Sequence, residues 1–151
     1  TLKAFVCEPD IVPPVRNAIS SAVSQISFHQ PEKYLEVVFW YKDVFNFMLQ
    51  NKDNDRICNS DVIGFFVLDA KVIGGIELSS QIKELFKNQM VNEWICGNLD
   101  DILERIMEGP DDSESLEIKD IFHQYDDIMD FFSRNSSDFD EEDELFRFNK
   151  N

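Results

Sequence analysis

The fold of this 151-residue chain depends on one stretch, DVIGFFVLDAKVIGGI at residues 61–76. Its apolar run is so continuous that periodicity cannot separate a buried helix from buried strands. Ser60 as an N-cap and Gly74-Gly75 as a terminator favour a helix, whereas Gly64 and the many Val, Ile and Phe residues favour a strand. We take a helix as the first interpretation, with an α+β fold as the alternative.

The segments before this stretch have mostly helical spacing. Pro13-Pro14 suits a first helical turn, and apolar residues that recur at helical intervals predict a helix over about 13–27, with a core stripe of Val15, Ile19, Ala22, Val23 and Ile26. Pro31 opens a second helix to about 50, although a strand start at 35–41 is possible. Its segment 37–41, Val-Val-Phe-Trp-Tyr, is apolar on nearly every side, so it should be central or contact a partner. Alternation over 2–6 allows a short strand.

The segments after it also predict helices. One apolar stripe gives a helix over about 80–97, carried by Ile82, Leu85, Phe86, Met90 and Trp94. Asn98 caps the next helix, which Gly109-Pro110 stops. The strongest pattern predicts an amphipathic helix over about 114–133, formed by Ile118, Ile121, Phe122, Tyr125, Ile128, Met129 and Phe132.

These elements predict a mostly α fold, a compact helical domain of about five or six helices with a possible small β element. We expect one globular domain over 1–135. An acidic tail that carries aromatic residues follows over 136–151, with a possible short helix around 139–147. The helical segments share no sequence at a constant period, so a solenoid is not expected.

The charge of the chain is unevenly distributed. Net charge is −16, of which residues 1–99 contribute −3 from 12 acidic and 9 basic side chains. Residues 100–151 contribute −13 from 18 acidic and 5 basic side chains. A field of this sign repels nucleic acid and attracts cationic surfaces. Direct nucleic-acid binding is therefore disfavoured, and a basic protein is the expected partner.

The acidic residues of the last third are interleaved with aromatic residues. Aromatic anchors supply affinity while charges supply steering and selectivity. The predicted partner-binding residues are Asp120, Asp126, Asp127 and Asp130 on the predicted helix, with Asp138, Phe139, Asp140, Glu141, Glu142, Asp143 and Glu144 in the tail. Acidic runs are often only solubilising, and that interpretation stays open beside the first.

Catalytic and metal-binding patterns are weak. Asp120, His123 and Asp127 could supply metal ligands from one helix face, but an exposed histidine among acids is the simpler interpretation. The loop from residue 51 begins like a calcium loop, yet it has Arg56 where the turn needs Gly and Val62 where the closing Glu belongs. We expect no enzyme activity, no cofactor and no metal.

The three cysteines and the hydropathy indicate the compartment. Cys7, Cys58 and Cys96 are widely spaced and show no CxxC or Cys/His pattern, so a disulfide framework or zinc site is not expected. No run of about 18 uncharged apolar residues is present, and the first residues do not resemble a signal peptide. The expected location is a reducing cytoplasm, without membrane association.

These observations favour one function and leave two alternatives. We expect an acidic binding protein that neutralises a basic protein partner, such as an immunity protein that blocks a toxin or nuclease. One alternative is a DNA mimic that inhibits a nucleic-acid-binding enzyme. The other is a non-catalytic adaptor or chaperone that binds through the aromatic segment 39–41.

Overall fold

A computed structural model of the chain describes residues 2–117, which form helices and no strand. The helices are α1 (Leu2–Cys7), α2 (Pro13–His29), α3 (Tyr34–Gln50), α4 (Ser60–Val72), α5 (Ser79–Lys87), α6 (Glu93–Cys96) and α7 (Leu99–Glu108), with single 3₁₀ turns at Pro31–Lys33, Ile76–Leu78 and Asp112–Glu114. The mostly α fold is confirmed. The short strand predicted over 2–6 is wrong, because this segment is α1.

Contacts divide the chain into two compact units, Thr1–Ser115 and Leu116–Asn151. The helix predicted from about 114 does not begin within the described residues, since 115–117 are not helical. The rest of that prediction, the short helix around 139–147 and the boundary predicted after residue 135 lie outside the described residues.

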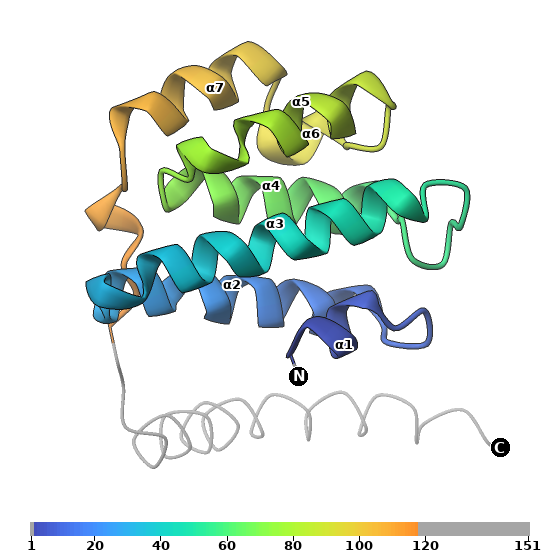
Figure 1. The fold of residues 1–151 in the computed structure, drawn as a ribbon, viewed down its shortest axis with the longest axis horizontal. Coiled ribbons are helices and arrows are strands. Elements are labelled where there is room, and N and C mark those ends of the chain that lie inside the picture. The colour runs from blue at the N-terminus through green and yellow to red at the C-terminus, as the bar shows by residue number, and fades with distance from the viewer. Residues whose placement is uncertain (1, 118–151) are drawn as a thin grey trace, which may run out of the picture. The chain divides into compact units, whose positions relative to one another are not determined.

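Most of the stretch 61–76 forms the central helix, α4, which ends at Val72. Its fully buried side chains are Val62, Ile63, Phe66, Val67 and Ala70. They are buried because α2, α3, α6 and α7 all pack against this helix (Figure 1). A helix covered on nearly all sides has no polar stripe, which explains why its sequence resembled a buried strand.

Both ends of α4 are determined by short-range hydrogen bonds. Asn59, and not the predicted Ser60, is the N-cap, and its side chain accepts from the backbone N–H groups of Asp61 and Val62. At the other end Gly74 has φ +66°, and the N–H of Gly75 donates to the carbonyl of Ala70 at 3.1 Å. This is a Schellman ending, so the predicted terminator is confirmed.

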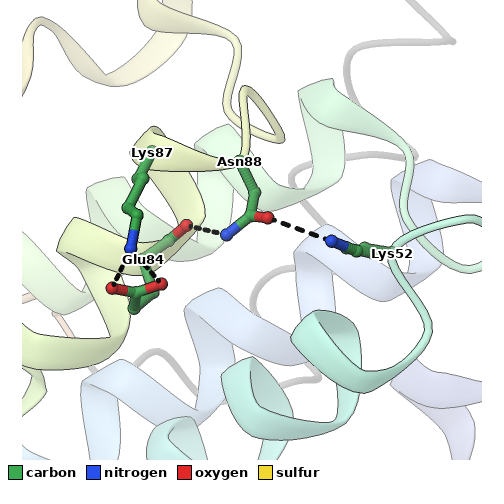
Figure 2. Close-up of polar contacts among 4 residues, drawn as sticks. All are labelled: Lys52, Glu84, Lys87 and Asn88. Carbon is green, nitrogen blue, oxygen red and sulfur yellow. Dashed lines mark hydrogen bonds and ion pairs between the residues drawn. The ribbon is translucent and has the colours of Figure 1, made fainter.

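The helix predicted over 80–97 is interrupted after Lys87. Gln89 adopts φ +56°, and the N–H of Met90 donates to the carbonyl of Leu85 at 3.0 Å, so α5 also has a Schellman ending. Figure 2 shows the side chains at this end, where the Asn88 amide donates to the Glu84 carbonyl at 2.7 Å. The chain therefore turns after α5, and residues 93–96 form the separate helix α6.

The first helix is attached to the bundle by a buried arginine. Arg16 of α2 donates from Nε to the carbonyl of Val6 and from Nη2 to the carbonyl of Ile57, both at 2.7 Å. Its Nη1 donates to the carbonyl of Arg56 at 3.4 Å. Burial lowers the pKa of Arg16. This guanidinium thus joins the end of α1 and the segment before α4 to α2.

The buried face of α2 is not the predicted one. Of the expected core stripe only Val23 is buried, whereas Val15 and Ile26 are exposed. The buried residues of α2 are Arg16, Ser20, Val23 and Ser24. The polar members are accepted in the core because each has hydrogen-bond partners there, such as the Ser21 carbonyl for the Ser24 hydroxyl at 2.7 Å.

Candidate functional site

All eleven residues predicted to bind a partner lie beyond residue 117, outside the described residues. The acidic side chains that the structure does describe are concentrated at the end of the first unit. Between residues 93 and 114 the chain has eight acidic side chains and a single basic one, Arg105. This segment contains α6 and α7.

Helix α7 carries an acidic face, which we define as Asp100, Asp101, Glu104 and Glu108. All four side chains are exposed, while Ile102 and Ile106 on the other side are buried in the core. Residues 100, 104 and 108 follow one another at intervals of four, so they line one side of the helix. Met107 projects among them and is 68% exposed. The acidic face therefore includes one apolar side chain.

The single cation of this segment is already neutralised. The Arg105 guanidinium pairs with Asp111 at 2.6 Å and with Glu108 at 3.4 Å, and it also donates to the Gly109 carbonyl at 3.0 Å. The pKa of Asp111 is lowered, first by its bonds with Ser113 and then by Arg105. Arg105 thus fixes the end of α7 and leaves the other acids of this face without a cation from their own helix.

Trp94 lies on α6, immediately before α7, and is 99% exposed. Its backbone N–H donates to the side-chain oxygen of Asn92 at 3.0 Å, so Asn92 caps this short helix. The Asn92 amide donates in turn to Asp61 at 2.6 Å, and its backbone N–H donates to the Ser60 carbonyl at 3.2 Å. The indole is therefore presented by a backbone that is attached to α4.

Close packing also holds α6 in place. A Cβ added to Gly64 of α4 would lie 3.1 Å from the carbonyl oxygen of Asn92 and 3.2 Å from Cβ of Ile95. Only a glycine permits this approach without displacement. Cys96, two residues after Trp94, is buried in the core. We name Trp94, Glu93, Met107 and the acidic face the α6–α7 surface.

Sequence reasoning missed Trp94 as a surface residue. The stripe that contained it was assigned to a continuous helix, and the interruption at Gln89 moves Trp94 out of the core. One signal was present, because Asn92 two residues before Trp94 is a typical N-cap. A new helix starting there removes the helical register that placed Trp94 on the same stripe as Ile82 and Leu85.

A second cluster has perturbed acid–base properties but is enclosed. The Ser20 hydroxyl donates to Asp69 at 2.5 Å, and the Tyr41 hydroxyl donates to the Ser20 carbonyl at 2.7 Å. Burial raises the pKa of Asp69 to about 7 and raises that of Tyr41 well above its usual value. Ser20 and Tyr41 are fully buried, so a substrate cannot reach their hydroxyls. This cluster joins α2, α3 and α4 as part of the core.

The aromatic segment 39–41 divides between core and surface. Tyr41 is buried, Trp40 is half-buried and stacks on Phe66 at 6.3 Å between ring centroids, and Phe39 is 62% exposed. Beside Trp40 lies an open hollow of about 320 Å³, lined mainly by Leu2, Val23, Ile26 and Val37 with Gln30, Lys33 and Glu36 at its polar positions. Trp40, which belongs to the predicted adaptor segment 39–41, is one of the residues that line this hollow.

The remaining candidate residues have structural contacts. The amide of Asn51 in the calcium-like loop donates to the Phe47 carbonyl at 2.8 Å, and the Cys58 thiol donates to the carbonyls of Met48 and Asn51 at 3.2 Å. Burial raises the pKa of Cys58 and Cys96 to about 11. All three cysteines are free, and across residues 2–117 no three His, Cys, Asp or Glu side chains are arranged to hold a metal ion.

No helix within residues 2–117 has the length and apolar character needed to cross a membrane. No protein-family model, curated protein or solved structure matches the chain.

Proposed function

We propose that the chain is a non-enzymatic acidic binding protein that captures a basic protein partner through the α6–α7 surface. Trp94 carries the proposal, because its side chain is 99% exposed while the hydrogen bonds of Asn92 attach its backbone to α4. Tryptophan is among the residues that most often dominate binding energy at protein interfaces. The exposed acids of α7, the next helix along the chain, support a cationic partner.

The parts of this surface have complementary roles in binding. The uncompensated acids, such as Asp100 and Glu104, attract a cationic surface over a distance and favour its orientation. The apolar side chains, Trp94 and Met107, supply area that is removed from water on contact. Because Trp94 is attached through Asn92 and Gly64, little conformational entropy of the backbone is lost when the partner binds.

Neutralisation is the biological outcome that we propose for this binding. A basic toxin or nuclease binds anionic substrates through cationic residues, and an acidic protein that covers those residues blocks access. The acids beyond residue 117, which include Asp120 and Asp127, would add to the same attraction. This proposal therefore combines the α6–α7 surface with the residues first predicted from sequence.

The test uses the full chain, immobilised, to capture proteins from extracts of its own cells at low salt, with elution by a salt gradient. Two variants address the surface: Trp94→Ala and the double variant Asp100→Asn with Glu104→Gln. We expect the captured protein to be basic, and its affinity to fall by at least about thirtyfold with Trp94→Ala, the usual size of an aromatic hot spot. The double variant should weaken binding and reduce its salt dependence.

Matched controls change the same chemistry elsewhere. Phe39→Ala removes an exposed aromatic residue on α3, and Glu32→Gln with Asp53→Asn removes two exposed acids away from α7. Both controls should bind like the wild type. If binding ignores the α6–α7 variants and is lost with Phe39→Ala, the adaptor function is correct instead. Stoichiometric addition of the chain to a captured nuclease or toxin should abolish its activity, and unchanged activity would refute neutralisation.

A further inference from the structure

We propose that the pocket beside Arg16 binds a small carboxylic acid in its ionised form, with the carboxylate held against the buried guanidinium. The pocket is open and has a volume of about 260 Å³. Residues 9–13, before and at the start of α2, and residues of the loop before α4 line it together with Arg16, and these two loops meet at one end of the bundle (Figure 1). None of the lining residues belongs to the α6–α7 surface, so the site is independent of the proposed function.

The Arg16 side chain brings an unbalanced positive charge to this pocket. Arg16 is 1% exposed, and its three hydrogen bonds all go to backbone carbonyl groups. Among residues 2–117 no carboxylate forms an ion pair with it. The thiols of Cys7 and Cys58 are the ionisable groups that act on its pKa, and burial raises the pKa of both thiols, so both are neutral at pH 7. A buried charge without a counter-ion is costly, and an anion in the pocket would supply one.

Hydrogen-bond donors remain at this site. A guanidinium has five N–H groups, and Arg16 uses three of them, so the others have no acceptor among the described residues. The side-chain oxygen of Asn59 caps α4, whereas its amide nitrogen donates to no described residue. Arg56 adds a second guanidinium, which is largely exposed and pairs with Asp10. A carboxylate is the acceptor that matches these donors, because a guanidinium can bind both of its oxygens.

Two helices begin at the pocket. Val12 and Asn59, the N-cap residues of α2 and α4, both line it. These helices have 17 and 13 residues, and the N-terminal end of each carries a partial positive charge that favours an anion. Pro13 and Pro14 have no N–H group, so the first two residues of α2 contribute to this field and donate no hydrogen bond. The field therefore adds to the attraction by the guanidinium groups.

The remaining lining residues select the class of anion. The apolar wall of the pocket is formed by Pro9, Ile11, Val12 and Pro13. Asp10 and Asp55 also line the pocket, and both are exposed. Because like charges repel in proportion to their size, these two carboxylates oppose a dianion such as hydrogen phosphate more strongly than a monoanion. A small monocarboxylate with an apolar body thus fits both the charges and the wall.

The experiment titrates the full chain, labelled with nitrogen-15, with benzoate, benzamide or inorganic phosphate at pH 7 and constant ionic strength, and follows binding by NMR. Benzamide has the shape of benzoate without its charge. We expect saturable binding of benzoate, at least about tenfold weaker binding of benzamide because the charge-assisted hydrogen bonds are lost, and no saturable binding of phosphate. The Nε–H signal of Arg16 should move with benzoate, whereas that of Arg105, which is already paired with Asp111, should not.

Substitutions of exposed residues change the charge at the pocket and spare the core. Asp55→Asn removes a repelling carboxylate and should tighten benzoate binding about twofold to threefold, whereas Asp53→Asn, in the same loop but outside the pocket lining, should leave it unchanged. Arg56→Gln should weaken binding by a similar factor, and Lys87→Gln, which removes an exposed cation from α5, is its control. Equal affinities for benzoate and benzamide would overturn the inference. An Arg16 Nε–H signal that stays in place at saturation, or phosphate that binds as tightly as benzoate, would also overturn it.

Discussion

Replacing Asp69 with asparagine should remove a large part of the pH dependence of stability. Asp69 lies on the central helix with the Ser20 hydroxyl 2.5 Å away, and the fully buried Tyr41 hydroxyl beside it. Burial disfavours its charged form and raises its pKa to about 7. Asparagine keeps the shape of the side chain and an oxygen that can accept from Ser20, but it cannot ionise. The substitution therefore isolates the cost of charging this one group.

The magnitude follows from the two pKa values. In the unfolded chain the carboxyl has its usual pKa of 3.8. At pH values between 3.8 and about 7, the folded state therefore binds more protons than the unfolded state does. A carboxyl with a raised pKa stabilises the fold less as pH rises, and the loss is complete above the folded pKa. The full shift corresponds to about 4 kcal/mol, of which somewhat more than half falls between about pH 5 and pH 8.

The assay is urea denaturation followed by circular dichroism at several pH values across that interval. Between the ends of the interval the wild type should lose about 2–3 kcal/mol more of its free energy of unfolding than Asp69→Asn loses. Asp100→Asn, which removes an exposed carboxylate from α7, is the matched control and should follow the wild-type curve. If Asp69→Asn also follows the wild-type curve, the internal carboxyl is not the source of the pH dependence and the argument is refuted.

Two further substitutions test contacts that hold the bundle together. Arg16→Met should lower the free energy of unfolding by roughly 3–5 kcal/mol, because the Val6 and Ile57 carbonyls would stay buried without their charged donor; an unchanged urea midpoint would contradict this. Gly74→Ala should lower the free energy of unfolding by more than Gly97→Ala, although both glycines have positive φ. A Cβ at Gly74 would lie 2.4 Å from the Gly109 carbonyl carbon, whereas a Cβ at Gly97 would meet nothing within 4 Å. The difference should exceed about 1 kcal/mol in thermal denaturation, and equal losses would show that the close contact is relieved by movement.

The two Schellman endings show which parts of the fold could be predicted from sequence. At the end of α4 the left-handed residue is Gly74, the residue type that this conformation favours, and the terminator was predicted correctly. At the end of α5 the same backbone geometry is adopted by Gln89, which carries no such signal. The first helix end was therefore predictable, whereas the second depends on the burial of Met90 against Leu85.

The error at α5 also accounts for the missed surface residue. A stripe of apolar residues predicts a buried face only if the helix is continuous, and Trp94 lies beyond the interruption. For α2 the reason was different, because Ser20 and Ser24 are buried with hydrogen-bond partners while Val15 and Ile26 face outward. Hydrophobicity alone cannot identify a buried face whose polar groups have hydrogen-bond partners inside the fold.

The buried guanidinium of Arg16 also bears on the order in which the chain folds. It joins carbonyls that are ten and forty-one residues away along the chain. Helix α1 has only six residues and is too short to be stable alone, so it gains its order from this contact and from packing against α2 and α3. Docking of α1 must then follow the assembly of α2 with the segment before α4. Substitutions in α1 should consequently speed unfolding and leave the refolding rate nearly unchanged, which makes the N-terminal helix a late event on the folding pathway.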